Sequence, residues 1–229
     1  MSIYNNTLQR NTVLVSFVGM ERCDILLYAA KILTAEKKEI LIIDNSCSKD
    51  LFLSVTHDPE SSMTDYRGIT IGKDIACSPE LFINYEYVLI YHGFNVDDRM
   101  LGLSDKVYVF TNYERSMSER LAKLLHSLPE GQGNVSIVYR DKISHKVPEK
   151  LVLKDLGISY AAIKEQYSLP FDKKDYSLYL FLTHNGSQSL KNASNAYVTI
   201  LFSIVADILG IDKAQLDKKT IQRMIKRTR

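Results

Sequence analysis

Short apolar runs alternate with amphipathic stretches along most of the chain. Val13–Val18 and Ile40–Ile43 are runs of β-branched, aliphatic and aromatic residues bounded by polar residues or glycine, as is typical of buried strands. Between them, within Arg22–Ala35, apolar residues recur at the three- and four-residue spacing of a helix with one buried stripe. Thr12–Ser46 therefore predicts a βαβ unit, whose first turn, Gly19–Asp24, joins a buried strand to a helix.

The alternation continues toward the C-terminus. Residues Cys47–Asp65 are polar and predict a loop with a short helix. Further strands are expected at Gly68–Gly72, Tyr87–Tyr91, Lys106–Thr111, Asn134–Tyr139 and Tyr160–Tyr167. Further helices are expected from Ser78, at Arg115–Leu128, at Pro148–Leu156, at Asp175–Leu182, and from a cap at Ser187 or Ser189 to Leu209. Strands alternating with helices predict the α/β class, with a mostly parallel sheet sandwiched between helix layers.

The composition narrows the class of protein. The chain has 229 residues, a net charge of +2 and no linker rich in Pro, Gly or Ser, which favours a single α/β domain and argues against a nucleic-acid binder that acts through its overall charge. No run reaches the ~18 apolar residues of a spanning helix, and Met1–Thr12 lacks the apolar core of a signal peptide. We therefore expect a cytoplasmic protein in which Cys23, Cys47 and Cys77 are reduced. The five His residues lack the spacing of a metal site.

The order of these elements resembles a known family over nearly the whole chain. In that family, a first strand is followed by the phosphate loop KGGVGKTT, a helix and a strand ending in a VLLIDxD-type run; Val13–Gly19, Ile25–Leu33 and Ile40–Ser46 occupy those places here. Tyr85–Gly93 is similar to a YDYVIIDTPPG-type segment, and Leu169–Asp172 to an IPYD stretch before the family's last long helix. The chain thus resembles the MinD/ParA group of deviant P-loop ATPases, with the atypical CpaE/TadZ branch as the nearest comparison. The resemblance implies a three-layer P-loop NTPase topology.

The positions that carry the chemistry of that family are altered. The phosphate-loop positions are Gly19, Met20, Glu21, Arg22, Cys23 and Asp24, which include one glycine, no lysine and no Ser or Thr. In a phosphate loop, glycines let backbone N–H groups curve around the anion, while the lysine and the hydroxyl serve the phosphates and Mg²⁺. At the metal and water positions the chain keeps Asp44 but has Ser46 and Tyr91 in place of acids. The resemblance, with these losses, predicts a pseudo-ATPase without a cofactor or metal.

Two acidic residues in the altered turn suggest a physical consequence. Glu21 and Asp24 fall in the predicted first turn of a helix, where free N–H groups and the helix dipole favour negative charge by about 0.3–1 kcal/mol per acid. We hypothesise that these carboxylates occupy the place of a phosphate and repel a triphosphate. An alternative is that they are simply favourable residues for the start of a helix.

The C-terminal residues 211–229 are predicted to form a basic amphipathic helix or tail, beyond a domain that spans residues 1–210. Its candidate docking residues are Leu216, Lys218, Lys219, Ile221, Arg223, Met224, Ile225, Lys226 and Arg227. MinD-type proteins carry a terminal amphipathic helix that lies on anionic membrane, so the resemblance implies a peripheral membrane contact. The apolar strip is narrow and has no aromatic residue, which favours packing on the domain over docking on a membrane or partner, with DNA binding third.

The sequence as a whole predicts a scaffold or positioning factor that acts through protein–protein contacts. Its partner is expected to be a second copy or an active ATPase relative, and the CpaE/TadZ resemblance implies a bacterial pilus, secretion or conjugation machine. One alternative is an atypical ATPase that binds nucleotide through the altered loop, with Arg22 supplying the charge. Another is a DNA partition protein, which the small net charge disfavours.

Overall fold

A computed structural model describes residues 12–19, 22–75, 79–96, 98–127, 134–143, 146–185 and 189–216 of the chain. Its strands are β1 (Val13–Gly19), β2 (Ile40–Asp44), β3 (Met63–Asp65), β4 (Thr70–Lys73), β5 (Tyr87–Gly93), β6 (Lys106–Thr111), β7 (Val135–Lys142) and β8 (Ile163–Pro170). Its helices are α1 (Asp24–Ala35), α2 (Asp50–Leu53), α3 (Pro79–Phe82), α4 (Asp98–Leu103), α5 (Arg115–Leu124), α6 (Glu149–Leu156), α7 (Lys173–Asn185) and α8 (Asn195–Leu209). Short 3₁₀ turns lie at Leu125–Ser127, Tyr160–Ala162 and Lys213–Gln215.

The described strands form one sheet in the order β3-β4-β2-β5-β1-β6-β7-β8. Every neighbouring pair is parallel except β3 and β4, so the prediction of a mostly parallel sheet is confirmed. β1 lies at the centre, where Val15 pairs with Leu89 of β5 and with Lys106 of β6. Every residue of β2 and β5 is buried, as expected for apolar strands covered on both faces.

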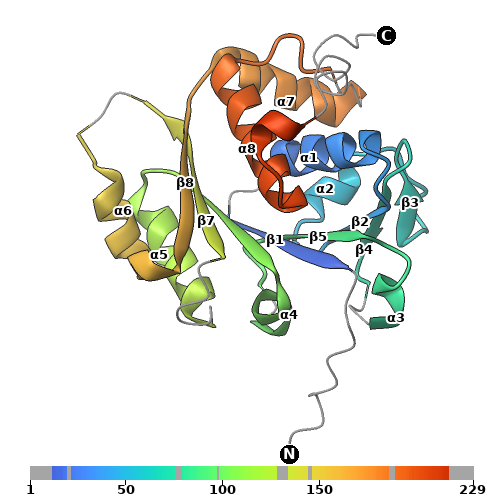
Figure 1. Cartoon of the computed structure of the whole chain (residues 1–229), viewed down its shortest axis with the longest axis horizontal. Coiled ribbons are helices and arrows are strands. Elements are labelled where there is room, and N and C mark those ends of the chain that lie inside the picture. Colours follow the sequence, from blue (N-terminus) through green and yellow to red (C-terminus); the bar gives the residue numbers. More distant parts are fainter. Residues whose placement is uncertain are drawn as a thin grey trace, which may run out of the picture.

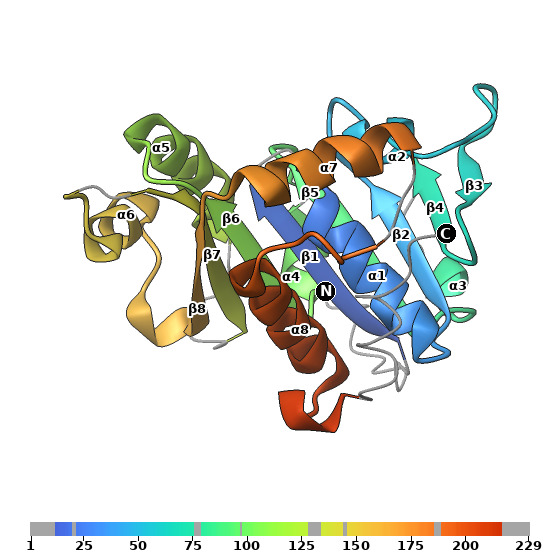
Figure 2. The ribbon, with the colours of Figure 1, turned by 90° about the horizontal axis from the view of Figure 1, so that it is seen from above.

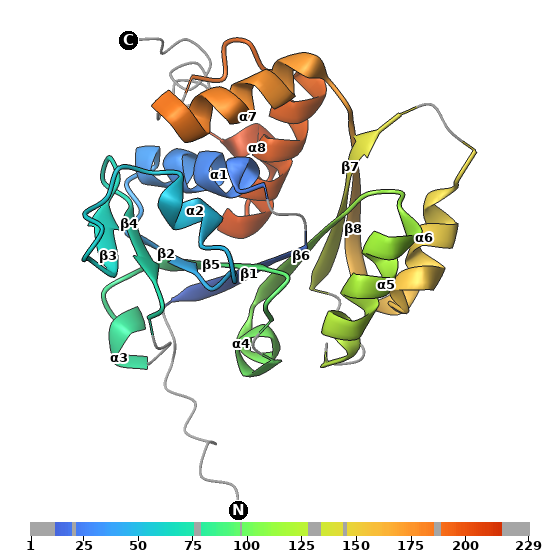
Figure 3. The same ribbon diagram turned by 180° about the vertical axis from the view of Figure 1, so that it is seen from behind.

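Helices cover both faces of the sheet, which makes the three-layer α/β architecture. Helices α1, α7 and α8 lie on one face, and α3, α4, α5 and α6 lie on the other (Figures 1 and 3). The largest core cluster joins α1 and α8 to side chains such as Val15 and Phe17, while Leu14 and Val18 face the helices of the opposite layer. The period-2 alternation of β1 thus supplies both cores.

The last long helix begins later than the sequence predicts. Ser189 lies in a separate turn before α8, and Ser187 is outside the described residues. The residue that caps α8 is Ser194, whose Oγ accepts a hydrogen bond from the N–H of Tyr197 at 3.1 Å. Asp175 of α7 fixes this cap, because its carboxylate accepts from the N–H and the Oγ of Ser194 at 2.7 and 2.6 Å.

Two further differences have local causes. Helix α4 was not expected, because it has only six residues, shorter than the window in which a helical period is recognisable; Met100 and Leu101 are nevertheless buried against the sheet. Strand β8 spans Ile163–Pro170, whereas the sequence predicts a strand over Tyr160–Tyr167; Tyr160–Ala162 forms a 3₁₀ turn instead. Strand β8 forms the edge of the sheet, where a proline costs no ladder hydrogen bond on its open side.

Candidate functional site

The candidate site lies where β1 ends and α1 begins, at the carboxyl edge of the sheet. Gly19 has a φ of +109°, and a Cβ at this residue would lie 2.0 Å from the carbonyl oxygen of Phe110 on β6. The close approach of the two strands therefore requires glycine here. Met20 and Glu21 lie outside the described residues, which resume at Arg22.

A buried ion pair occupies the first turn of α1. The carboxylate of Asp24 accepts hydrogen bonds from Nη1 and Nη2 of Arg140 at 2.7 and 2.9 Å. The hydroxyl of Tyr197 donates to the same carboxylate at 3.0 Å. All three residues are at most 2% exposed. The cluster therefore joins the start of α1, the end of β7 and the first turn of α8 through a bidentate, charge-assisted contact.

Both members of this pair stay charged. Burial alone would raise the pKa of Asp24, but the charge and hydrogen bonds of Arg140 outweigh burial and hold that pKa below its ordinary value. Burial would lower the pKa of Arg140, but the carboxylate of Asp24 raises it above the ordinary value. Because Arg140 supplies a counter-charge, Asp24 adds little net negative charge at this turn, and the hypothesis that Glu21 and Asp24 repel a triphosphate stays a prediction. Glu21, the other acid of that hypothesis, is outside the described residues.

Arg22 is engaged on two sides. Its Nη2 donates to Oδ2 of Asp141, which follows Arg140 on β7. Its guanidinium carbon lies 5.7 Å from the centre of the Tyr176 ring on α7, within the range of a cation–π contact. The side chain of Arg22 is only 13% exposed. Arg22 thus links the altered turn to β7 and α7, and Figure 2 shows α7 passing over the beginning of α1.

Cys23 precedes α1 and remains a neutral thiol. Burial, with the nearby negative charge of Asp24, raises the pKa of its thiol to about 12. A thiol at a helix start usually becomes more acidic, so the buried setting reverses the usual effect. Cys23 therefore offers neither a nucleophile nor a charge at neutral pH.

Asp44 and Ser46, at the predicted metal and water positions, bind each other and α2. One carboxylate oxygen of Asp44 accepts from the N–H and the Oγ of Ser46 at 3.0 and 2.6 Å. The other accepts from the N–H of Phe52 at 2.9 Å. Asp44 and Ser46 are both fully buried. The carboxylate of Asp44 thus holds the loop and short helix that follow β2.

The space beside Tyr91 is nearly filled. A cavity of about 10 Å³ lies between Phe17, Val18, Arg22, Leu26, Tyr91 and Phe110. A single buried water needs roughly 10–15 Å³ measured in this way. The rings of Phe17 and Phe110 stack with centroids 6.0 Å apart and form part of the wall. The described residues therefore leave room beside Tyr91 for about one water molecule.

A Ser–His contact lies deeper in the sheet. Oγ of Ser16 is 3.0 Å from Nε2 of His92 and 2.7 Å from Oγ of Ser104. Ser16 and His92 are fully buried, and Ser104 is 4% exposed. No substrate can reach a hydroxyl with this burial, so the network serves the packing of β1, β5 and the end of α4.

Sequence reasoning did not identify Arg140, Asp141 or Tyr197. Arg140 follows the apolar run of β7 directly, and a cation that ends a buried strand was the available signal. Its partner Asp24 is 116 residues away in the sequence, so no local pattern joins them. Nothing in the sequence distinguished Tyr197 from the other apolar residues of α8, so its contact with Asp24 could not be predicted.

The predicted docking residues are mostly beyond the described chain. Leu216 is 4% exposed and belongs to the largest core cluster. The other candidates, from Lys218 to Arg227, lie outside the described residues. Within the described ranges, no cluster of three or more His, Cys, Asp or Glu side chains is arranged to hold a metal ion. No helix in those ranges has the length and apolar character needed to cross a membrane.

Comparisons with known proteins identify the fold. No protein-family model matches the chain, and no curated protein matches it by sequence. Among solved structures, a ParA family ATPase from Chlorobium tepidum TLS matches with a TM-score of 0.55 and 14% identity, over 93% of this chain and 98% of that one. The cell division protein MinD of Aquifex aeolicus matches with a TM-score of 0.58 and 17% identity, over 88% of this chain and 98% of that one. A chain of the MinC:MinD cell division protein complex of the same organism matches with a TM-score of 0.58 and 12% identity, over 88% of this chain and 97% of that one. The chain therefore has the fold of the MinD/ParA ATPases.

Proposed function

We propose that this protein is a non-catalytic scaffold or positioning factor on a MinD/ParA-like fold, a pseudo-ATPase that acts through protein–protein contacts. The observation that carries the proposal is the buried cluster of Asp24, Arg140 and Tyr197 at the start of α1. A phosphate at a helix start needs free N–H groups, positive charge and space. Here the guanidinium of Arg140 is already paired with the carboxylate of Asp24.

The neighbouring positions support the same conclusion. Asp44 has its oxygens directed to Ser46 and the backbone of α2, and the cavity beside Tyr91 is about 10 Å³. A nucleotide site normally requires several hundred Å³. Binding a nucleotide with its Mg²⁺ would require these internal contacts to be broken, and each buried charge would lose its partner.

An ATPase that binds through Arg22 is the main alternative. Its guanidinium is directed to Asp141 and lies beside Tyr176, so a phosphate would have to compete with an internal carboxylate. A DNA partition role is the second alternative, and a net charge of +2 gives it little electrostatic support.

The biological setting follows from fold analogy and is part of the proposal. One of the similar structures is a complex between MinD and MinC, so the fold is used there to bind another protein. We infer that this chain likewise works with a protein partner, either a second copy or an active ATPase relative, and assists a bacterial pilus, secretion or conjugation machine in the cytoplasm or at the inner face of the membrane.

Titration with a fluorescent ATP analogue in the presence of Mg²⁺ tests the proposal. We expect no saturable binding, no phosphate release and no change in the mass measured by size-exclusion light scattering when ATP is added. The Arg22→Ala variant is the matched control for the alternative. Micromolar binding to the wild-type chain that this variant abolishes would overturn the proposal in favour of an atypical ATPase.

A further inference from the structure

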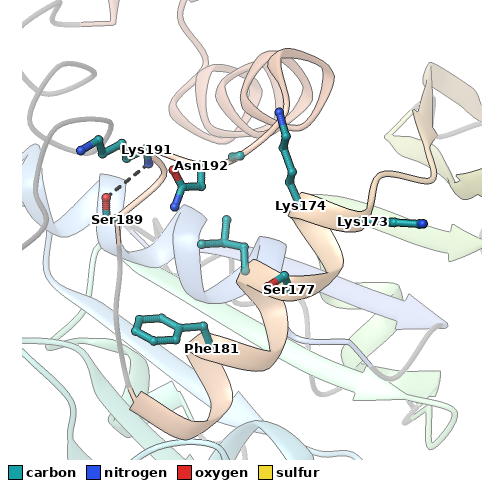
Figure 4. A pocket seen from close by; sticks show the side chains of 9 residues that line it. Lys173, Lys174, Ser177, Phe181, Ser189, Lys191 and Asn192 are labelled. Carbon is teal, nitrogen blue, oxygen red and sulfur yellow. Dashed lines mark hydrogen bonds between the residues drawn. The ribbon is translucent and has the colours of Figure 1, made fainter.

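A groove separates α7 from the segment that leads into α8. Its volume is about 650 Å³, and its lining comes from one side of α7 and from residues 189–193 (Figure 4). Leu178, Phe181 and Ala193 provide the apolar part of this lining. Lys174 and Lys191 stand at its edge, with Asn192 between them (Figure 4). The groove is distinct from the filled site at the start of α1.

Helix α7 has apolar residues on more than one side. Leu178 and Leu182 are buried and hold the helix on the domain, with Asp175 anchored to Ser194. Leu180 and Phe181 are 43% and 50% exposed on the other side. A helix of a folded domain normally presents polar residues to solvent, so large apolar side chains on this side indicate a contact surface. Of these two residues, Phe181 lines the groove.

Lys173, Lys174 and Lys191 bring positive charge to the groove. Among the described residues, Lys173, Lys174 and Lys191 have no ion pair or hydrogen bond from their ammonium groups. Two acids lie close by on the same segment: Asp172 accepts from the N–H of Lys174 at 2.7 Å, and Asp175 accepts from the N–H and Oγ of Ser194. Three lysines against these two carboxylates leave an excess of positive charge. A ligand with carboxylates therefore meets free cations next to an apolar floor.

We propose that this groove binds an acidic segment of a partner protein, with an aromatic or aliphatic side chain against Phe181 and carboxylates at Lys174 and Lys191. The proposal rests on the proposed function, since it gives the scaffold a docking site for its partner. Complementary charge at the edge and an apolar anchor in the centre match the usual anatomy of a peptide-binding groove.

The terminal segments of this chain do not suit the groove. Residues 1–11 contain no acid, and residues 217–229 contain Asp217 against six Lys and Arg residues. Like charges would repel at Lys174 and Lys191. The chemistry therefore favours a different protein as the occupant.

Selection of random peptides displayed on phage against the folded full-length chain tests the proposal. We expect enriched peptides to carry Asp or Glu on either side of an aromatic or aliphatic residue. In fluorescence anisotropy titrations of the synthesised peptides, the Lys174→Glu/Lys191→Glu and Phe181→Ser variants should each lose about tenfold or more in affinity, and binding should weaken as salt is added. Lys150→Glu/Lys154→Glu and Leu151→Ser, exposed positions on α6, are the matched controls and should bind as the wild type does.

Three results would overturn the inference. The first is a selection that enriches no acidic peptide, and the second is peptide binding that the groove variants leave unchanged. The third is binding of phosphatidylglycerol vesicles or random duplex DNA that the groove variants abolish while acidic peptides do not bind. The ATP titration described above is run on the same preparation. Acidic peptides that bind to a chain that also hydrolyses ATP would refute the pseudo-ATPase and leave the groove assignment intact.

Discussion

The start of α1 and the groove beside α7 use positive charge in opposite ways. At α1, the guanidinium of Arg140 is buried and makes two hydrogen bonds to Asp24. At the groove, the ammonium groups of Lys174 and Lys191 are exposed and have no partner among the described residues. In the first region, the charges of Arg140 and Asp24 neutralise each other within the chain. In the second region, the charges of the lysines are available to a ligand.

This contrast indicates that charged groups stabilise the fold at α1 and remain available for binding at the groove. A buried cluster whose members come from α1, β7 and α8 fixes the relative positions of these elements. Removing either charged member leaves the other charge buried without a counter-ion. An exposed lysine keeps its hydration and contributes little to folding. Because the ammonium groups at the groove make no ion pair with the described residues, they are free to pair with a ligand. We therefore assign a structural role to the ion pair at α1 and a binding role to the groove at α7.

The largest expected effect comes from removing the guanidinium at α1. Arg140→Met keeps most of the side-chain volume but leaves Asp24 charged and buried. We expect a loss of about 3–5 kcal/mol in the free energy of unfolding, measured by urea denaturation at pH 7.

The matched control is Arg115→Met, which removes an exposed partner of Glu119 on α5 and should cost less than about 0.5 kcal/mol. The double variant Asp24→Leu/Arg140→Met should recover part of the loss, because no charge is left unpaired. A cost below about 1 kcal/mol for Arg140→Met, the upper limit for a surface pair, would mean that the pair is open to water and that the two regions do not differ in this way.

A pair of glycine substitutions gives effects of opposite sign. Gly19→Ala places a Cβ 2.0 Å from the Phe110 carbonyl oxygen at a φ of +109°, and we expect a loss of about 2–3 kcal/mol. Gly102→Ala on α4 meets nothing within 4 Å, and should stabilise the protein by about 0.5–1 kcal/mol. Thermal denaturation of both variants measures the difference. Equal effects would show that β1 and β6 can separate at Gly19, which would reopen space at the altered turn.

The third prediction concerns acid. The pKa of Asp24 in the folded chain is below its ordinary value of 3.8, so the ionised carboxylate stabilises the folded state above about pH 4 and this contribution is lost as the pH falls further. In urea denaturation series between pH 5 and about pH 2, Asp24→Asn should reduce the slope of stability against pH by up to about 1.4 kcal/mol per pH unit. Glu149, whose pKa the hydrogen bond from Lys142 lowers to about 2, titrates in the same range and remains in both proteins. An unchanged slope would show that Asp24 is not held ionised by Arg140.

The sequence predicts the first βαβ unit well because short-range patterns of residues determine its strands and helix. The strand Val13–Gly19, the helix Asp24–Ala35 and the strand Ile40–Asp44 lie within a residue or two of the predicted bounds, since periodicity and the glycine at the turn determine them. The prediction is poorer where residues far apart in the sequence determine the start of a helix. Ser194, and not Ser189, caps α8 because Asp175 holds it, and a short-range pattern contains no such information.

The same limit applies to the candidate site and to the groove. An acid at a helix start predicts a dipole contact, but the decisive partner of Asp24 comes from β7 and cannot be found without the topology. The apolar residues of Asp175–Leu182 predict a helix, but not that Phe181 remains half exposed while Leu182 is buried. Burial depends on which side of α7 packs on the domain, and that is a property of the assembled fold.

The smallest expected effect completes the comparison. Lys174→Glu/Lys191→Glu reverses two exposed, unpaired charges, so we expect the free energy of unfolding to change by less than about 0.5 kcal/mol. The control is Lys106→Met on β6, whose ammonium lies 3.2 Å from Oδ1 of Asp207 and is largely buried, and which should cost about 1–2 kcal/mol. Urea denaturation of both variants measures these values. A loss for the groove variant as large as that for Lys106→Met would show that Lys174 and Lys191 are paired within the chain, and the groove would then belong to the fold as the site at α1 does. A small loss, together with lost peptide binding, would assign the two lysines to recognition alone.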